Sequence, residues 1–496
     1  MEPCDLTAVE ARRLIGAKQL SPSELLESCI GRIEAVDPAV NAMPVRDFDR
    51  ARIAAKVADQ AVVRGDTLPP LHGLPIGIKD LELTGGLLTT FGSPLFRDNV
   101  PAADERVVAA VRTAGAIVIG KTNVPEFGAG ANTRNAVFGA TGNPFDPSRS
   151  CAGSSGGSAV ALATGMAPLC TGSDTGGSLR NPAAFCGVTG FRPSPGVVPN
   201  ERRTHGWSGL PVTGPMARTV ADTALLLGAM AGDSAADPLA IAIYAATVRQ
   251  ADDFFPLKPL DLSRLRVAAT ADFGFAPTER QVAATFAGKL DLFQHVFAHA
   301  DLAAPDCSGT DEAFEILRAV YFVGSHLEKV RRTPDLVGPN VRANVAEGLR
   351  YGAEDIARAF SLQTALYNRW QTFFQGYDVI LTPSITISPR SWRELYPAEI
   401  DGKPTRTYFH WLAMAYAVTV VGHPAISLPV GLDGAGMPFG LQIVGPRGGD
   451  ALVLRVAAQL ESLLAQDPRT ARPVPDLAAL KSAPPIREAA GFLGFD

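Results

Sequence analysis

The chain has 496 residues, of which 46% are hydrophobic and 19% charged, a composition that suits a soluble globular enzyme with a sizeable core. Its 45 basic and 50 acidic residues give a formal charge of -5 without any long basic run, so we expect no nucleic-acid partner. The N-terminal residues MEPCDLTAVEARRLIG contain acidic side chains and no apolar core, which is unlike a signal peptide.

Six cysteines are scattered along the chain without a C-x-x-C pair or a disulfide-framework spacing. This usage predicts free thiols in a reducing cytoplasm. Cys151 lies beside a glycine-rich stretch and is the one candidate nucleophile among them, although a structural role is strongly favoured.

The first third of the chain alternates between helical and strand patterns. Residues 5–64 have helical spacing, and one helix is expected to start with Ser21 as N-cap and Pro22 in its first position. Residues 74–80, LPIGIKD, predict a short buried strand that ends in a lysine. A helix then runs from 104 to 115, and AIVIG follows as a strand.

Later segments complete the α/β pattern. Residues 156–166 predict a helix of small residues, and residues 235–370 are variable and largely helical. YDVILTPS and GMPFGLQIVG have strand character, and a closing amphipathic helix is expected to have Asp450 as its N-cap. The apolar run 412–421 is about half a membrane span, so a buried strand or core helix is expected there rather than membrane contact.

The stretch GSDTGGSLRNP, residues 172–182, places two glycines directly before Ser178. Glycine costs conformational entropy and adds nothing to a core, so such a pair needs a local reason. Consecutive backbone amides here could converge on a developing oxyanion, which is often the largest catalytic contribution of an acyl-transfer site. The alternative is a tight turn with an exposed serine, and this stretch alone does not decide between the two.

The second glycine-rich stretch, CAGSSGGSA, contains the pattern G-x-S-x-G centred on Ser155. That pattern would indicate an α/β-hydrolase, which also needs an acid and then a histidine later in the chain. None of the seven histidines has a telling context; His423 is the best candidate, but a packed structural histidine is favoured. A phosphate-binding loop is excluded because no G-K-[ST] closes the segment.

Without a histidine, a lysine whose pKa is lowered by burial can serve as the base. Lys79 ends the apolar run GLPIGIK, where an ammonium would be poorly solvated. The alternatives are that it reaches out of the strand end towards solvent or pairs with Asp80. No serine precedes a lysine by three positions, so an S-x-x-K arrangement is absent.

Taken together, GLPIGIKD, GSSGGSA and GSDTGGSLRNPAAFCG resemble the amidase signature family of serine hydrolases. The resemblance extends from about residue 5 to 465 and is weakest over 235–370. It implies a triad of Lys79 as base, Ser154 as a bridge held by a cis peptide, and Ser178 as nucleophile. The separations of 75 and 24 residues fit the family. One departure is Ala152, where a glycine is common.

The family also implies an α/β fold around a large, twisted, mostly parallel sheet covered by helices on both faces, usually in a homodimer. It implies an oxyanion hole formed by the amides of Thr175, Gly176, Gly177 and Ser178. It implies an acyl pocket lined by Gly128, Ala129 and Gly130, and loops braced by Ser155, Asp174 and Arg180. No metal or organic cofactor is implied.

We expect residues 1–496 to form a single domain. Residues 1–64 would be its N-terminal helical segment, 65–234 and 371–470 its α/β core, and 235–370 an insertion that shapes the substrate pocket. The last 25 or so residues would wrap the surface.

The expected activity is hydrolysis of amide bonds in small molecules by a free-standing enzyme. One alternative is the A subunit of a glutamine-dependent tRNA amidotransferase, although the segment after Ser178, FRPSPGVVPNERRTHGWSGLPVTGPMART, is closer to free-standing amidases. Another is a family member that only binds amide ligands. The particular amide, and whether esters or carbamates are cleaved, stay open.

Overall fold

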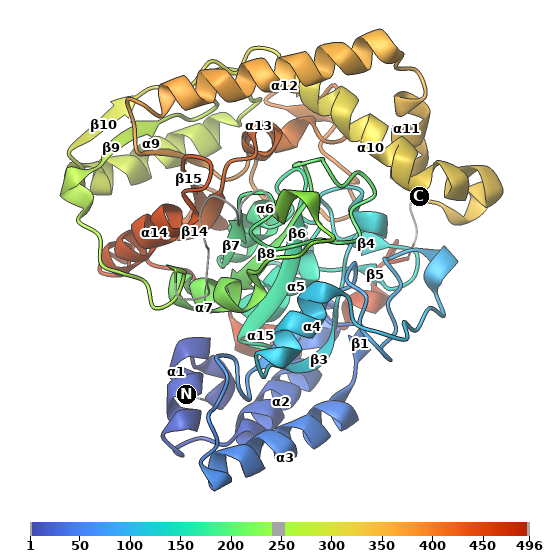
Figure 1. The fold of residues 1–496 in the computed structure, drawn as a ribbon, viewed down its shortest axis with the longest axis vertical. Coiled ribbons are helices and arrows are strands. Elements are labelled where there is room, and N and C mark those ends of the chain that lie inside the picture. Colours follow the sequence, from blue (N-terminus) through green and yellow to red (C-terminus); the bar gives the residue numbers. More distant parts are fainter. Residues whose placement is uncertain (1, 241–252, 494–496) are drawn as a thin grey trace.

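An eleven-stranded mixed sheet runs through the structure and is flanked by helices (Figure 1). The computed structural model describes residues 2–240 and 253–493, and these form one α/β domain. In spatial order the strands are β1 (Val45–Arg46), β3 (Ile117–Thr122), β2 (Pro75–Lys79), β6 (Leu169–Asp174), β8 (Val212–Ala217), β7 (Thr189–Arg192), β14 (Ala425–Leu432), β15 (Pro438–Val444), β11 (Val379–Pro383), β9 (Arg266–Ala269) and β10 (His299–Leu302).

Parallel pairing is found towards both ends of this sheet and antiparallel pairing in its centre. Strands β3, β2 and β6 are parallel neighbours, and so are β11, β9 and β10. The strands from β6 through β8, β7, β14 and β15 to β11 pair antiparallel. The expected fold class, a large sheet covered by helices, is confirmed.

The helices cover both faces of the sheet. Their bounds are α1 (Ala8–Gly16), α2 (Pro22–Val40), α3 (Phe48–Arg64), α4 (Arg106–Thr113), α5 (Gly156–Ala163), α6 (Arg180–Cys186), α7 (Val220–Met230), α9 (Arg280–Phe293), α10 (Thr310–Arg332), α11 (Pro339–Gly348), α12 (Ala353–Phe373), α13 (Ala413–Val421), α14 (Asp450–Leu464) and α15 (Leu477–Ser482). Two short hairpins, β4 (Arg134–Asn135) with β5 (Gly139–Ala140) and β12 (Glu399–Ile400) with β13 (Lys403–Pro404), lie outside the main sheet.

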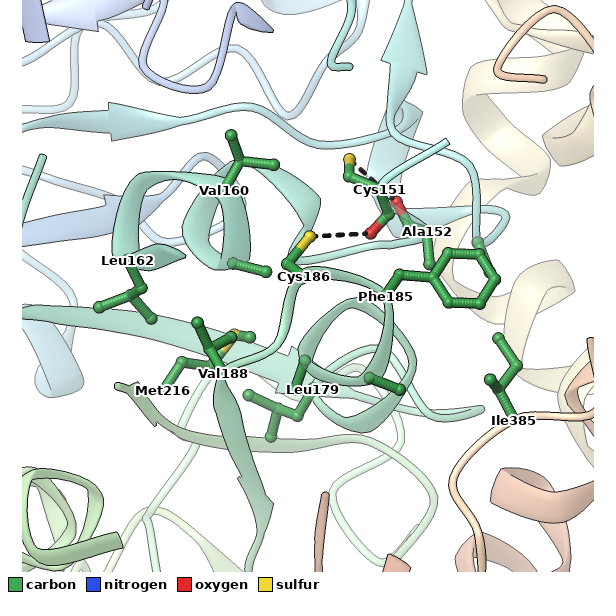
Figure 2. Packing of buried hydrophobic residues seen from close by; sticks show 14 of the residues in the cluster. Cys151, Ala152, Val160, Leu162, Leu179, Phe185, Cys186, Val188, Met216 and Ile385 are labelled. Carbon is green, nitrogen blue, oxygen red and sulfur yellow. Dashed lines mark hydrogen bonds between the residues drawn. The ribbon is translucent and has the colours of Figure 1, made fainter. Parts of the chain in front are cut away.

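Alternate residues of the strands enter two separate cores, as the two-residue period of a strand requires. In β3, Ile117 and Ile119 belong to the core under α2, α5, α6 and α13, whereas Val118 belongs to the core under α1, α4, α7, α9 and α14. Figure 2 shows the first core around α5 and α6, where Val160 and Leu162 pack near Cys186. Both faces of the central strands are therefore buried from solvent, and any polar side chain on them loses its contact with water.

Several expected elements are confirmed. Helix α2 begins at Pro22 with Ser21 as N-cap, whose hydroxyl accepts a hydrogen bond from the backbone of Glu24. Strand β2 ends at Lys79, and α4 and β3 follow as expected. The apolar run 412–421 forms α13, the core-helix alternative.

Two expectations differ from the structure. The N-cap of α14 is Gly449, while Asp450 is the first helical residue and its carboxylate accepts hydrogen bonds from the backbone and hydroxyl of Ser194, both at 2.7 Å. Segment 235–370 contains α9 to α12, but it also supplies β9 and β10 to the main sheet. These strands have four residues each, too few to show a period among helical patterns.

Helices α10 to α12 lie at the end of the molecule opposite the N-terminal helices α1 to α3 (Figure 1). None of the helices in the described ranges combines the length and the apolar character that a membrane span requires.

Helix α5 approaches the end of β3 so closely that only glycine fits. A Cβ on Gly157 would overlap the backbone nitrogen of Asn123 and lie 2.5 Å from the carbonyl oxygen of Ala42. Gly288, in α9, has no atom within 4 Å of an added Cβ.

We expect Gly157→Ala to lower the free energy of unfolding by about 1–3 kcal/mol, because backbone atoms must move to admit the methyl group. Gly288→Ala, its control, should raise stability by up to about 1 kcal/mol through helix propensity. Urea unfolding of both variants measures the difference; equal midpoints would contradict the close approach.

Candidate active site

Lys79 and Ser154 are joined by a hydrogen bond inside the protein. Strand β2 ends at Lys79, and its Nζ donates to Ser154 Oγ at 2.8 Å, across 75 residues of sequence. The same amine donates to Ser173 Oγ at 2.9 Å, on the neighbouring strand β6. Lys79 has no exposed surface, so the contact is shielded from water.

Ser178 lies beside this pair. The peptide bond Gly153–Ser154 is cis, and the next amide, of Ser155, donates to the carbonyl oxygen of Ser178 at 3.2 Å. The structure thus brings the loop before α5 against the loop before α6. In the described residues no hydrogen bond links the hydroxyls of Ser154 and Ser178; Ser178 is partly exposed, while Ser154 is buried.

The environment of Lys79 favours the neutral amine. Burial lowers the pKa of Lys79 to about 7, while the charge of Asp174 and, when it is ionised, that of Glu82 act in the opposite direction. Its hydrogen-bond partners are hydroxyls and the carbonyl oxygen of Ser173 rather than carboxylates. A lysine that is substantially unprotonated near pH 7 can accept a proton from a hydroxyl.

Asp174, at the end of β6, organises the loop that leads to Ser178. Its carboxylate accepts hydrogen bonds from Arg180 at 2.9 and 3.0 Å, from Arg192 at 3.2 Å and from the backbone amides of Gly177 and Leu179 at 2.9 and 3.3 Å. The two guanidinium groups hold the pKa of Asp174 well below its usual range despite its complete burial. The carboxylate therefore stays charged, and the loop is tied to it from both sides.

The four amides expected to form an oxyanion hole are not equivalent. The Gly177 amide already donates to Asp174, whereas the amides of Thr175, Gly176 and Ser178 have no hydrogen-bond partner in the described part of the chain. Gly177 has φ of +101°, and a Cβ there would lie 2.5 Å from Asn181 Oδ1. The loop thus needs glycine at 177 to present the three remaining amides.

Ser155 and Arg180 brace the two loops. The Ser155 hydroxyl accepts from the amide of Ser173 at 3.3 Å and donates to the carbonyl oxygen of that residue at 3.4 Å. Arg180 extends beyond Asp174 to Gln442 Oε1 at 2.6 Å and Thr419 Oγ1 at 3.2 Å, which ties α6 to β15 and α13.

The segment Gly128–Gly130 borders the site in part. An added Cβ on Gly128 would stand 3.3 Å from Ser154 Oγ, so this residue backs directly onto the serine. Ala129 instead packs into a small apolar cluster with Phe322 and residues of α11. Gly130, with φ of +121°, lies next to Asn340.

A cavity of about 350 Å³, which we call the aromatic cavity, borders the site through Ser173 and Thr175. Phe91, Phe96 and Phe127 form one wall, with ring centroids 5.0 to 6.3 Å apart. Helix α10 contributes Tyr321, Ser325, His326 and Lys329, and the remaining lining includes Glu82, Glu105, Arg202 and Arg203.

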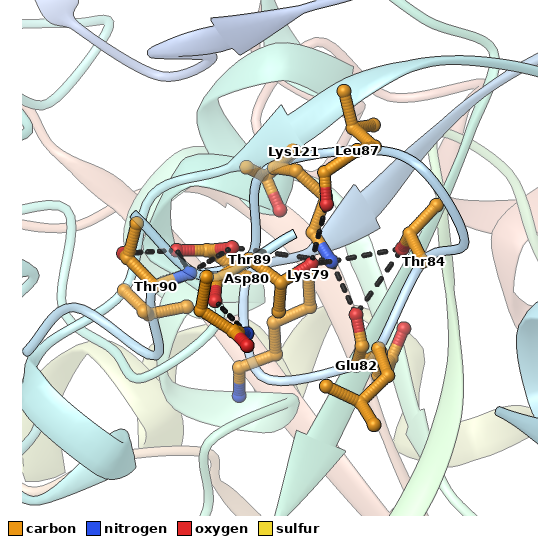
Figure 3. A network of polar contacts seen from close by, with 12 residues as sticks. Lys79, Asp80, Glu82, Thr84, Leu87, Thr89, Thr90 and Lys121 are labelled. Carbon is orange, nitrogen blue, oxygen red and sulfur yellow. Dashed lines mark hydrogen bonds and ion pairs between the residues drawn. The ribbon is translucent and has the colours of Figure 1, made fainter. Parts of the chain in front are cut away.

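A second buried lysine lies next to the site. Lys121, on β3, donates to the carbonyl oxygen of Glu82 and to Thr84 Oγ1 at 2.9 Å, and stands 3.9 Å from a carboxylate oxygen of Asp80 (Figure 3). The Glu82 carboxyl accepts from Thr171, and burial raises the pKa of Glu82 to about 8. Thr171 in turn accepts from the Lys79 amide at 3.0 Å, so this network holds the end of β2 in place.

The other candidate nucleophile and base are structural. Cys151 lies among the buried residues of the first core (Figure 2). Burial raises the pKa of Cys151 to about 12, so its thiol stays protonated. His423 packs among Trp370 and Phe374, its Nδ1 bonds the carbonyl oxygen of Gly445 at 2.8 Å, and burial lowers its pKa to about 4. Among the described residues, no group of three His, Cys, Asp or Glu side chains is arranged to hold a metal ion.

Sequence reasoning missed Ser173, Glu82 and Arg192. Ser173 stands in the glycine-rich stretch already quoted, two residues after Thr171, and the two-residue period of β6 could have placed both side chains on the face that contacts Lys79. A serine there gave no distinct signal of its own. Glu82 and Arg192 carry no motif, and only the fold brings them to Thr171 and Asp174.

Comparison with known proteins finds relatives that match along most of the chain. A sequence model of the Amidase family matches residues 24–454. The chain is 35% identical over 473 residues to an acylamidase of Rhodococcus erythropolis, covering 92% of this chain and 95% of that protein. It is 33% identical over 514 residues to the A subunit of the glutamyl-tRNA(Gln) amidotransferase of Acidothermus cellulolyticus, covering 95% and 97%.

A solved structure of a bacterial aryl acylamidase of the amidase signature family superposes with a TM-score of 0.85 at 26% identity, covering 94% of this chain and 98% of that one. The chain therefore belongs to the amidase signature family, whose members are hydrolases that act on carbon–nitrogen bonds.

The buried ion pairs of Asp174 with Arg180 and Arg192 predict how a substitution at Asp174 changes the free energy of unfolding. We expect Asp174→Asn to lower the free energy of unfolding by about 3–5 kcal/mol, because two buried guanidinium groups lose their counter-charge. Asp467→Asn, which breaks an exposed pair with Arg469, is the control and should shift the urea midpoint little. A wild-type midpoint for Asp174→Asn would contradict the assigned role of the carboxylate.

Proposed function

We propose that this protein is a free-standing amidase that converts an amide and water into a carboxylate and ammonia or an amine. The observation that carries the proposal is the 2.8 Å contact between Ser154 Oγ and an amine whose pKa burial lowers to about 7. The catalytic roles of Lys79, Ser154 and Ser178 belong to this proposal.

In the first half-reaction, Ser178 Oγ attacks the amide carbonyl carbon and forms a carbon–oxygen bond. Its proton passes to Ser154 Oγ as the proton of Ser154 passes to the neutral amine of Lys79. The carbonyl oxygen becomes negative and is held by the amides of Thr175, Gly176 and Ser178, each donor being worth about 3 kcal/mol in such sites.

The relay then runs in reverse. The Lys79 ammonium returns its proton through Ser154 to the amide nitrogen, the carbon–nitrogen bond breaks, and ammonia or an amine leaves with the electron pair. Water attacks the acyl group on Ser178 in the same manner, its proton entering the relay, and the carboxylic acid and a neutral Ser178 hydroxyl are regenerated.

The aromatic cavity is the proposed substrate site, because its lining includes Ser173, which contacts Lys79, and Thr175, three residues before Ser178. Its aromatic wall suits an apolar or aromatic substrate, and the name of one similar protein, an aryl acylamidase, supports an aromatic one. Helix α10 belongs to segment 235–370, so we propose that this segment selects the substrate.

The test is amine and ammonia release by the purified chain on primary amides, anilides and carbamates. Ser178→Ala should abolish turnover, since removal of the nucleophile in serine hydrolases lowers kcat on the order of 10⁶-fold. Ser308→Ala, which changes an exposed serine in the turn before α10, is the control. Turnover that survives in Ser178→Ala would refute the assignment of the nucleophile.

The pH dependence follows from Lys79. Only the neutral amine accepts a proton, so kcat/KM should rise with pH through about 7 and fall tenfold per pH unit below it. Lys79→Arg keeps a cation that does not lose its proton and should be inactive at every pH. An acid limb centred near 10, the value of an exposed lysine, would contradict a buried base.

A second candidate is the A subunit of a glutamine-dependent amidotransferase, favoured by relatives of that name at 33% identity. The two functions separate on the isolated chain. A free-standing amidase turns over simple amides by itself, whereas a component of an amidotransferase would need partner proteins. Covalent labelling of Ser178 by a fluorophosphonate, tested beside turnover, distinguishes both from a family member that only binds amides.

A further inference from the structure

The charges that line the aromatic cavity are compensated, with one exception in the described part of the chain. Arg203 pairs with Asp237 at 3.1 Å, and Arg202 pairs with Glu105 at 3.2 Å. These four side chains therefore bring no net charge to the cavity.

The remaining acid and the imidazole are neutral near pH 7. Burial raises the pKa of Glu82 to about 8, so its carboxyl group is largely protonated. Burial and the positive charges of Lys329 and Arg318 lower the pKa of His326 to about 3. Neither group can balance a cation in the cavity.

Lys329 is the exception. Its Nζ donates to the carbonyl oxygen of Ser325 at 2.6 Å, one turn earlier in α10, and lies 5.8 Å from the centroid of the Phe127 ring. No carboxylate pairs with this half-buried ammonium in the described residues, and burial lowers its pKa. An ammonium has three donors, so two of them are available to a ligand.

His326 adds a second unused group. Its Nδ1 is buried without a hydrogen-bond partner, and its ring lies against Phe127 in a tilted arrangement with centroids 4.8 Å apart. A neutral imidazole carries one N–H, which can donate to an anionic oxygen. The cation, the imidazole and the aromatic wall meet at one side of the cavity.

We propose that Lys329, assisted by His326, binds a carboxylate of the substrate, so that the preferred amides have an aromatic body and carry a negative charge away from the scissile bond. The inference rests on the proposed function for the position of the amide at Ser178. A carboxylate there would give the half-buried ammonium of Lys329 a charge partner, which the described residues of the protein do not supply.

The experiment measures binding without turnover. Ser178→Ala protein is titrated calorimetrically with benzamide, and with benzamide carrying a carboxylate at its meta or para position. We expect one of the two carboxylates to bind about 10- to 100-fold more tightly than benzamide, as for a charge-assisted hydrogen bond.

Variants made in the same background locate the effect. Lys329→Met should reduce the ratio of carboxylate to benzamide affinity to about one, and Lys329→Arg should retain much of it. Arg331→Met removes one positive charge from an exposed position of the same helix and should leave the ratio unchanged, which controls for net charge.

The inference is overturned if neither carboxylate binds more tightly than benzamide, if neither binds measurably, or if Lys329→Met keeps the ratio. Its failure is distinct from failure of the proposed function. Wild-type protein given the same three compounds reports hydrolysis separately, so amide turnover without a carboxylate preference would reject the anion subsite alone.

Discussion

Burial of an amine at the end of β2 is the constraint on which the site depends. Lys79 stands where a strand that is dry on both faces meets two loops, and its amine finds hydroxyls rather than carboxylates within hydrogen-bond distance. A charged ammonium in that place would lose its hydration without gaining a direct counter-ion, and the pKa falls accordingly. The same burial that disfavours the charge leaves a neutral amine near pH 7, as the proposed role of Lys79 as base requires.

The negative charge of Asp174 raises the pKa of Lys79 and so opposes the effect of burial. Arg180 and Arg192 form ion pairs with Asp174, and their positive charges offset much of the effect of its negative charge on Lys79. Asp174 also accepts hydrogen bonds from the amides of Gly177 and Leu179, so the carboxylate that acts on Lys79 also shapes the loop that carries Ser178. The guanidinium groups of Arg180 and Arg192 thus influence both the charge environment of Lys79 and the shape of this loop.

The triad candidates could be predicted because each sits in a local pattern: a strand that ends in lysine and two glycine-rich stretches at family spacing. Helix α2 could be predicted for the same reason, since Ser21 and Pro22 act on their own neighbours. The contacts of Glu82 with Thr171 and of Arg180 with Gln442 span 89 and 262 residues, and no local pattern reveals them. Asp450 looked like a cap, but its carboxylate serves Ser194 on a distant segment.

The candidate catalytic residues and the lining of the cavity come from different elements of the fold, which explains why family membership does not settle the substrate. Lys79, Ser154 and Ser178 are placed by β2, α5 and α6, which are packed on the core and tied together by buried hydrogen bonds. The cavity charge comes from α10, whose outer turns contact that core less and carry Lys329. Under the proposed function, a substitution on α10 would change what the cavity attracts without disturbing the Lys79 amine, so similar chains could share the chemistry and differ in the amide that they accept.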